Sequence, residues 1–210
     1  SAFLLNRSSD LEIINGENTL IEGSSFDNSS AVFRGGAIYI DGANAKVKDS
    51  NFTDSSIADG TYNSTNRPRG GAIYIKADDA TVEGSIFINS TVSNTFGDGG
   101  AIYIEGDYAK ILGSEFEYSR AHTGGAIYLE GDSCNVTGST FTYSHANENG
   151  GAMYSTGSKS TVYKSNFINN LAELSGGAIY WYGGSYSKYN TVDGCIFTNN
   201  TAHGNTSVKS

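Results

Sequence analysis

The chain has 210 residues, a formal net charge of −9 at pH 7, 27 glycines and one proline. This acidity argues against binding to nucleic acid or to an anionic membrane surface. No apolar run approaches the length that spans a bilayer, so we expect no membrane insertion by this segment, and glycine without a three-residue period excludes collagen.

The chain is a series of repeats built around the pentapeptide Gly-Gly-Ala-Ile-Tyr. The pentapeptide occurs at residues 35–39, 70–74, 99–103, 124–128, 150–154 (with Met153 for Ile) and 176–180, at spacings of 25 to 35 residues. Repeats of this period indicate a solenoid, in which each unit packs on its neighbours. We therefore expect one domain over residues 1–210. Phe3 to Asn6 resemble the tail of a further unit, so we expect the chain to be part of a longer array.

A second pattern follows each pentapeptide and occurs once before the first of them. In this pattern, an aliphatic residue precedes a small residue by three positions and a phenylalanine by five. The phenylalanines are Phe26, Phe52, Phe87, Phe116, Phe141, Phe167 and Phe197. Ser or Asn stands three positions after each of them, at Ser29, Ser55, Ser90, Ser119, Ser144, Asn170 and Asn200. We expect these polar side chains to form a ladder that satisfies backbone groups left unpaired at a corner.

Polar and apolar residues alternate with period two around both patterns, which indicates strands. Ile38 and Ile40 flank Tyr39, for example, and Lys46 and Lys48 flank Val47. Because no segment carries an apolar face at helical spacing, a helical solenoid is excluded. The pattern predicts an all-β protein, a single-stranded parallel β-helix of about seven turns with three short strands per turn. Its core would be columns of Ile, Val and Phe.

The tyrosine of each pentapeptide has the parity of the polar positions, so we expect a stripe of tyrosines facing solvent. The stripe consists of Tyr39, Tyr74, Tyr103, Tyr128, Tyr154 and Tyr180. Such side chains can stack on sugar rings or anchor a protein partner. Alternatively, they stabilise the sheet by contacts between turns. The two interpretations are compatible.

Two insertions interrupt the repeat at the same corner of adjacent turns. The distance from phenylalanine to the next pentapeptide is 18 residues after Phe52 and 12 after Phe87, against 8 or 9 in most turns. The first insertion contains Tyr62, Arg67 and Arg69, and the second contains Phe96 and Asp98. Since insertions in a solenoid often map to its binding face, these residues form a candidate contact site. The alternative is a pair of tolerated surface loops.

Candidate catalytic groups are sparse in the sequence. Acids are expected to stack near one another at Glu105, Glu130, Asp107 and Asp132, with Lys76 one turn away. These oxygens could hold Ca²⁺, although a solvated charged stripe is the favoured interpretation. The three histidines, His122, His145 and His203, show no partner pattern. We therefore predict no catalytic residue, no metal site and no cofactor.

Cysteine usage and glycosylation motifs complete the compositional evidence. Cys134 and Cys195 fall in different columns two turns apart, beyond disulfide range, so we expect two small packing residues. Sequons for N-glycosylation occur at Asn6, Asn28, Asn51, Asn63, Asn89, Asn135, Asn199 and Asn205. Glycosylation and a surface rich in Ser, Thr and Asn suit an extracellular protein.

The alternation of GGAIY units with Phe-x-x-Asn/Ser units, from Phe3 or Leu11 to about Ala202, resembles two groups of adhesin-like surface proteins. They are the chlamydial polymorphic outer membrane proteins and the large adhesin-like proteins of methanogenic archaea. The resemblance implies a right-handed β-helix that is displayed at the cell surface and acts in adhesion to other cells. We expect the partner to be a glycan or protein of another cell, and the chain to be a monomer. The resemblance assigns no catalytic residue. Two alternatives stay open: a β-helix polysaccharide lyase or glycoside hydrolase, and a passive structural spacer.

Overall fold

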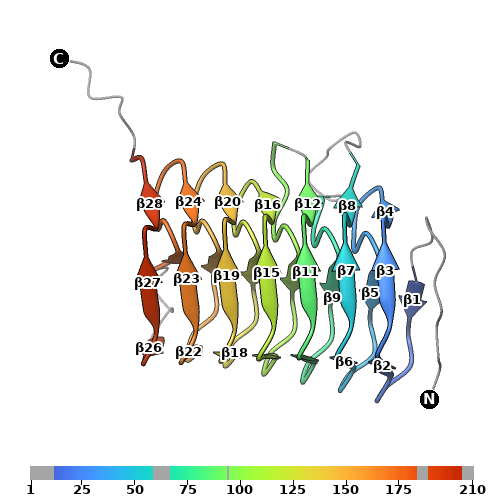
Figure 1. Ribbon diagram of the computed structural model, residues 1–210. Helices are drawn as coiled ribbons and strands as arrows, with labels where there is room; N and C mark the ends of the chain where they lie inside the picture. Colours follow the sequence, from blue (N-terminus) through green and yellow to red (C-terminus); the bar gives the residue numbers. More distant parts are fainter. Residues whose placement is uncertain (1–11, 59–66, 94, 184–188, 205–210) are drawn as a thin grey trace.

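The computed structural model describes residues 12–58, 67–93, 95–183 and 189–204 of the chain. The backbone winds through seven turns of a right-handed parallel β-helix (Figure 1). Each turn contributes one strand to each of four seven-stranded sheets, which we call sheets A to D, and every strand pairing is parallel. The predicted fold is confirmed.

The strands follow one another around each turn in the order A, B, C, D. Sheet A contains β1 (Glu12–Ile14), β5 (Ile38–Ile40), β9 (Ile73–Ile75), β13 (Ile102–Ile104), β17 (Ile127–Leu129), β21 (Met153–Ser155) and β25 (Ile179–Trp181). Sheet B contains β2 (Leu20–Glu22), β6 (Lys46–Lys48), β10 (Thr81–Glu83), β14 (Lys110–Leu112), β18 (Asn135–Thr137), β22 (Thr161–Tyr163) and β26 (Thr191–Asp193). Sheet C contains β3 (Ser25–Asp27), β7 (Asn51–Thr53), β11 (Ile86–Ile88), β15 (Glu115–Glu117), β19 (Thr140–Thr142), β23 (Asn166–Ile168) and β27 (Ile196–Thr198). Sheet D contains β4 (Ser30–Ala31), β8 (Ser56–Ile57), β12 (Thr91–Val92), β16 (Arg120–Ala121), β20 (His145–Ala146), β24 (Leu171–Ala172) and β28 (Thr201–Ala202).

The sequence pattern predicts three strands per turn, and this number is wrong, because sheet D adds a fourth strand to each turn. Its strands are two residues long, too short for an alternation of polar and apolar residues to be recognised. They still contribute inward side chains, because Ile57, Val92 and Ala121 form an apolar cluster separate from the main core.

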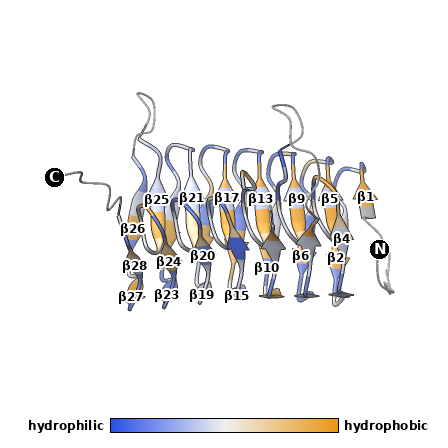
Figure 2. Ribbon diagram, turned by 90° about the horizontal axis from the view of Figure 1, so that it is seen from above, coloured by the Kyte–Doolittle hydropathy of each residue, from blue (hydrophilic) through white to orange (hydrophobic). Residues whose placement is uncertain are grey.

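The main core is a set of in-register columns. Sheet A contributes two inward aliphatic residues from most turns, and sheets B and C contribute one each; the hydropathy of β5, β9 and β13 is visible in Figure 2. The phenylalanines of sheet C stack with ring centroids 4.7 to 5.1 Å apart and planes within 7° of parallel. This spacing is that of adjacent strands, so each ring repeats the position of its neighbour.

Each corner of the turn depends on one residue with a left-handed backbone. Between sheets A and B these residues are Asn18, Asn44, Asp79, Tyr108, Ser133, Lys159 and Tyr189. Between sheets B and C they are Gly23, Asp49, Gly84, Gly113, Gly138, Lys164 and Gly194. Between sheets C and D they are Asn28, Asp54, Asn89, Tyr118, Tyr143, Asn169 and Asn199. Between sheets D and A they are the first glycines of the pentapeptides. Gly, Asn and Asp dominate because they adopt this conformation at the lowest cost.

The second glycine of each pentapeptide has a different role, because it allows two backbones to approach. A Cβ atom on Gly100 would lie 2.0 Å from the carbonyl oxygen of Gly125 and 2.7 Å from the nitrogen of Arg120. Gly100 is not in the left-handed region, so its role is purely steric.

Replacing Gly100 by alanine should therefore destabilise the protein far more than replacing Gly113 by alanine. Gly113 has φ of +53° with nothing within 4 Å of an added Cβ, so G113A carries only the left-handed strain of roughly 1 kcal/mol. G100A must displace backbone, and we expect a loss of roughly 3 kcal/mol or more. Urea unfolding followed by the fluorescence of the single tryptophan measures both. Equal losses would contradict the close-approach argument.

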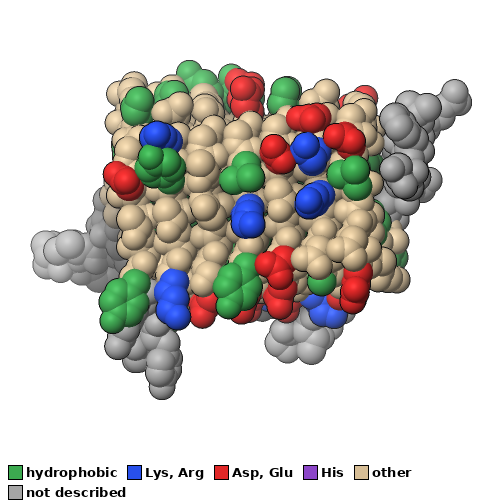
Figure 3. Space-filling model, turned by 90° about the horizontal axis from the view of Figure 1, so that it is seen from below, with side chains coloured by type: hydrophobic (Ala, Val, Ile, Leu, Met, Phe, Trp, Pro, Cys, Tyr) green, Lys and Arg blue, Asp and Glu red, His purple; other side chains and the backbone are tan. Residues whose placement is uncertain are grey.

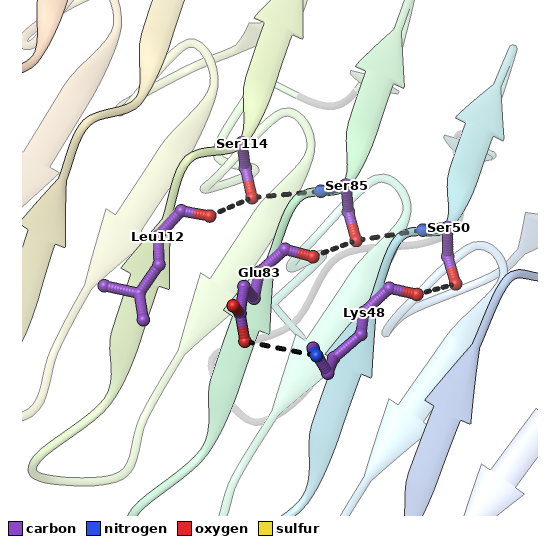
Figure 4. Close-up of polar contacts among 6 residues, drawn as sticks. All are labelled: Lys48, Ser50, Glu83, Ser85, Leu112 and Ser114. Atoms are coloured by element: carbon purple, nitrogen blue, oxygen red, sulfur yellow. Dashed lines mark hydrogen bonds and ion pairs between the residues drawn. The ribbon is translucent and has the colours of Figure 1, made fainter.

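A serine ladder runs along the corner between sheets B and C (Figure 4). Ser85 donates its hydroxyl hydrogen to the carbonyl of Glu83 at 3.0 Å and accepts the N–H of Ser50 at 3.2 Å. Equivalent bonds join Ser24, Ser50, Ser85, Ser114, Ser139 and Ser165. Cys195 continues the ladder, since its sulfur accepts the N–H of Ser165 at 3.4 Å. Because these serines are almost fully buried, the ladder satisfies backbone N–H groups that water does not reach.

The ladder expected three residues after each phenylalanine forms only where that residue is Asn. Asn170 donates to the carbonyl of Phe141 at 3.0 Å and accepts the N–H of Ser144 at 2.9 Å. The hydroxyls of Ser29, Ser55, Ser90, Ser119 and Ser144 are buried without a hydrogen-bond partner among the described residues. The prediction is wrong for these serines, because at this corner their hydroxyls reach no hydrogen-bonding group of a neighbouring turn.

Replacing Ser144 by asparagine should stabilise the protein. The new amide would repeat the bonds of Asn170 one turn earlier and remove a buried unpaired hydroxyl. We expect a gain of about 1 kcal/mol in the free energy of unfolding, measured by urea titration. The control is S144A, which removes the hydroxyl without adding a bond and should change stability less. Destabilisation by S144N would contradict the proposed geometry.

The outer surface over sheet B carries basic and acidic side chains interspersed among uncharged polar ones (Figure 3). For example, Lys48 Nζ lies 3.7 Å from Glu83 Oε2 on the adjacent strand. Within the described part of the chain, no helix has the length and hydropathy needed to cross a bilayer.

Candidate functional site

The pentapeptide tyrosines stack along sheet A with ring centroids 4.7 to 5.6 Å apart. They point away from the core, as the parity of the strand predicts, and none belongs to the apolar core cluster. The expected exposure is wrong in the middle of the stripe, however, because Tyr74 is 0% and Tyr103 is 1% exposed. Tyr39, Tyr128, Tyr154 and Tyr180 are half-buried, and ligand binding by these four stays a prediction.

Arginines from the corner between sheets D and A cover the buried tyrosines. The guanidinium of Arg34 lies 5.1 Å from the centroid of the Tyr74 ring, and that of Arg69 lies 4.5 Å from the centroid of Tyr103. Both geometries favour cation–π attraction. The corner residues preceding the glycines also bridge one another in parallel, from Arg34 through Arg69 to Asp98. A second, polar layer therefore lies over this part of sheet A.

The tyrosine hydroxyls donate to carboxylates of the following turn, Tyr74 to Glu105 and Tyr103 to Glu130. Burial, and then these hydrogen bonds, raise the pKa of both phenols above its usual range. Lys76 forms an ion pair with Asp41 rather than with Glu105, with 3.1 Å between Lys76 Nζ and Asp41 Oδ1. Tyr74 and Tyr103 are therefore occupied by intramolecular contacts, which supports a stabilising role for this half of the stripe.

The described residues at the ends of the two insertions lie side by side, as the sequence predicts, and an ion pair joins them. Arg67 Nε lies 3.0 Å from Asp98 Oδ2 and donates to the carbonyl oxygen of Phe96 at 2.7 Å, while Arg67 Nη2 donates to Asp98 Oδ1 at 3.2 Å. Phe96 is 44% exposed and its ring meets His122 edge-on at 5.7 Å. Tyr62 lies outside the described residues. Of the predicted contact residues in the insertions, Arg67 and Arg69 are thus engaged within the protein, while Phe96 presents part of its ring to solvent.

Asp98 is a buried acid, and burial makes its ionised form unfavourable. Its side chain is 1% exposed and also accepts a hydrogen bond from the Thr123 hydroxyl. Burial raises the pKa of Asp98 to about 6, against the opposing influence of Arg67 and Thr123. Because the raised pKa belongs to the folded state, protonation of Asp98 stabilises the fold.

The variant D98N should remove the part of the pH dependence of folding stability that comes from the titration of Asp98. Well below the usual Asp pKa of about 4, Asp98 is protonated in both the folded and unfolded states, and its contribution is fully present. This contribution is lost as the pH rises through about 6, so the stability of the native protein relative to D98N should fall by roughly 2 kcal/mol between pH 4 and pH 7. Urea titrations at pH 4, 5, 6 and 7 test this. A constant difference across the range would contradict the pKa assignment.

The stacked aspartates accept backbone hydrogen bonds at the corner between sheets A and B. Asp78 accepts the N–H of Asp107, Asp107 that of Asp132, and Asp132 that of Ser158, each at 2.8 Å. No group of three metal-binding side chains occurs within residues 12–58, 67–93, 95–183 and 189–204. The aspartates therefore act in capping the turns, and the Ca²⁺ interpretation gains no support from their geometry.

The histidines have acidic partners that the sequence pattern does not reveal. His145 Nε2 lies 3.0 Å from one oxygen of Glu173, and His203 Nδ1 lies 2.8 Å from the other. His122 Nε2 lies 3.5 Å from Glu148. Burial lowers the pKa of His122. These pairs join successive turns beside sheet D.

Both cysteines are free, as predicted. Cys134 is buried, and burial raises the pKa of its thiol to about 12. A thiol with this pKa is an inert packing group rather than a nucleophile.

Tyr118 and Tyr143 are surface residues that the sequence interpretation does not single out. They occupy the left-handed position between sheets C and D, are 51% and 47% exposed, and stack with centroids 5.2 Å apart. A signal is nevertheless present: the column two residues after each phenylalanine contains Asn or Asp in the other turns, and Tyr only here. The pair adjoins a shallow groove of about 370 Å³ on sheet C.

Comparison with known proteins agrees with this architecture. The family described as the right handed beta helix region matches residues 71–209, so the chain belongs to this family. Comparisons with curated proteins and with solved structures each returned no match. Because fold does not determine function, the family leaves both binding and enzymatic roles open.

Proposed function

We propose that this chain is a segment of an extracellular, cell-surface adhesin. It acts as a monomer, and its β-helix presents a binding surface to a glycan or protein of another cell. The observation that carries the proposal is the stacked pair Tyr118 and Tyr143, half of whose surface is exposed on a rigid corner. Exposed aromatic side chains held by a rigid frame are favourable binding anchors, because little conformational entropy is lost on association.

The positions of the sequons support an extracellular location. Among the described residues, Asn28, Asn51, Asn89 and Asn199 are exposed and Asn135 is half-buried. Glycans at these positions would extend into solvent without entering the core. The four in-register sheets also give the segment the stiffness that display on a cell surface requires.

Adhesion can be tested with beads coated with the purified chain and incubated with a panel of microbial, plant and animal cells. We expect saturable retention on at least one cell type, competed by the soluble chain, because a binding surface has finite capacity. Albumin-coated beads are the control. Retention no greater than this control on every cell type would overturn the adhesin in favour of a spacer. Release of new chain ends from plant, microbial and host polysaccharides would instead indicate a lyase or hydrolase.

A further inference from the structure

The backbone conformation of Tyr118 and Tyr143 is unfavourable for tyrosine. Their φ angles are 54° and 52°, in the left-handed region that is unfavourable for a residue with a bulky side chain. Five other turns place Asn or Asp at this position. Two neighbouring turns therefore accept strain in order to hold two aromatic rings outside the fold, which is a feature typical of functional sites.

The packing of the fold uses only part of these rings. The two rings stack on each other with planes 8° apart, and this contact offsets part of the backbone strain. Roughly half of each side chain stays exposed. The exposed parts form a two-ring platform across adjacent turns.

The platform is next to a groove on sheet C. The groove is lined by Ile86, Ile88, Glu115, Phe116, Glu117, Thr140 and Thr142. Glu117 and Thr142 immediately precede Tyr118 and Tyr143 in the chain, so the two tyrosines lie at the corner beside the groove and do not line it. Ile86 and Ile88, each over one third exposed, form its apolar side.

The chemistry of these residues matches an oligosaccharide better than a protein. Aromatic and aliphatic surfaces can pack against the C–H faces of sugar rings, while Thr hydroxyls and Glu carboxylates bond the sugar hydroxyls. The volume of the groove, about 370 Å³, lies near the lower end of the range for small-ligand sites. A protein partner generally requires about 800 Å² from each side, far more than this platform offers.

The charge of the groove selects among sugars. Both ionisable residues that line it, Glu115 and Glu117, are acidic, and the chain has a net charge of −9. Arg120 lies past the corner on β16 and is exposed to solvent. Uronic or sulfated sugars would meet repulsion in the groove, whereas the ammonium group of an amino sugar would be attracted.

We propose that Tyr118 and Tyr143, together with the groove on β11, β15 and β19, bind an oligosaccharide of neutral or amino sugars. The inference rests on the proposed function, because it names the ligand class of the adhesin. The tyrosines provide the stacking platform, Thr140 and Thr142 bond hydroxyl groups, and the two glutamates favour a positively charged sugar.

The test uses the chain produced without glycosylation, so that no glycan at Asn89 lies beside Tyr118. Its affinities for cello-oligosaccharides, chitosan oligosaccharides and oligogalacturonates are measured by calorimetry. The binding variant is Y118N/Y143N, which installs the residue that other turns use and should fold at least as well. The matched control is Y108N, the same change at a left-handed residue of another corner, where Tyr108 is 55% exposed.

We expect binding to the neutral or the amino-sugar probe, weakened at least tenfold by Y118N/Y143N and unchanged by Y108N. E115Q/E117Q should weaken binding to chitosan oligosaccharides while leaving any binding to cello-oligosaccharides within twofold. Unchanged affinity in Y118N/Y143N, or a preference for oligogalacturonates, would overturn the proposal. Native protein that adheres to cells and binds none of the three sugars would overturn the groove and leave the adhesin standing. Failure of adhesion to cells would overturn the adhesin itself.

Discussion

The solenoid depends on single residues that reverse the chain at its four corners. Strands of two or three residues contribute too few hydrogen bonds to determine where a turn ends. The left-handed residue at each corner does so, since it redirects the backbone within one position. Register follows, because every turn bends at equivalent residues. The columns of Phe, Ile and Val are then aligned, and burial of their side chains stabilises the array.

Stacking of identical positions creates an apolar core, but it also buries backbone polar groups that need hydrogen-bond partners. Each corner interrupts the sheets and leaves N–H groups buried. Short side chains such as Ser85 and Asn170 satisfy these groups, because one hydroxyl or amide forms hydrogen bonds with two turns at once. The aspartates at the corner between sheets A and B serve the same purpose from the solvent side. Polar ladders therefore determine which residue types each column accepts.

The sequence predicts the repeat, the parallel strands and the inward columns, because these depend on local alternation. It does not predict which outward residues remain accessible. Parity correctly places Tyr74 and Tyr103 outside the core, yet arginines from corners of neighbouring turns cover them. The acidic partners of these tyrosines come from the following turn, at a separation that no local pattern reveals. Tyr118 and Tyr143 are detectable in principle, but only when the turns are aligned and the left-handed column is known.

The direction of the hydrogen bonds has a mechanical consequence. The bonds between turns run along the solenoid axis, so tension applied along that axis loads one turn against the next. A turn that detaches would release about 25 residues, or roughly 80 Å of extended chain, while the remaining turns stay paired. Because the turns interact chiefly with their neighbours, the rod would lengthen in steps and dissipate work at each one. In the adhesin that we propose, this stepwise extension would help to keep two surfaces joined under flow.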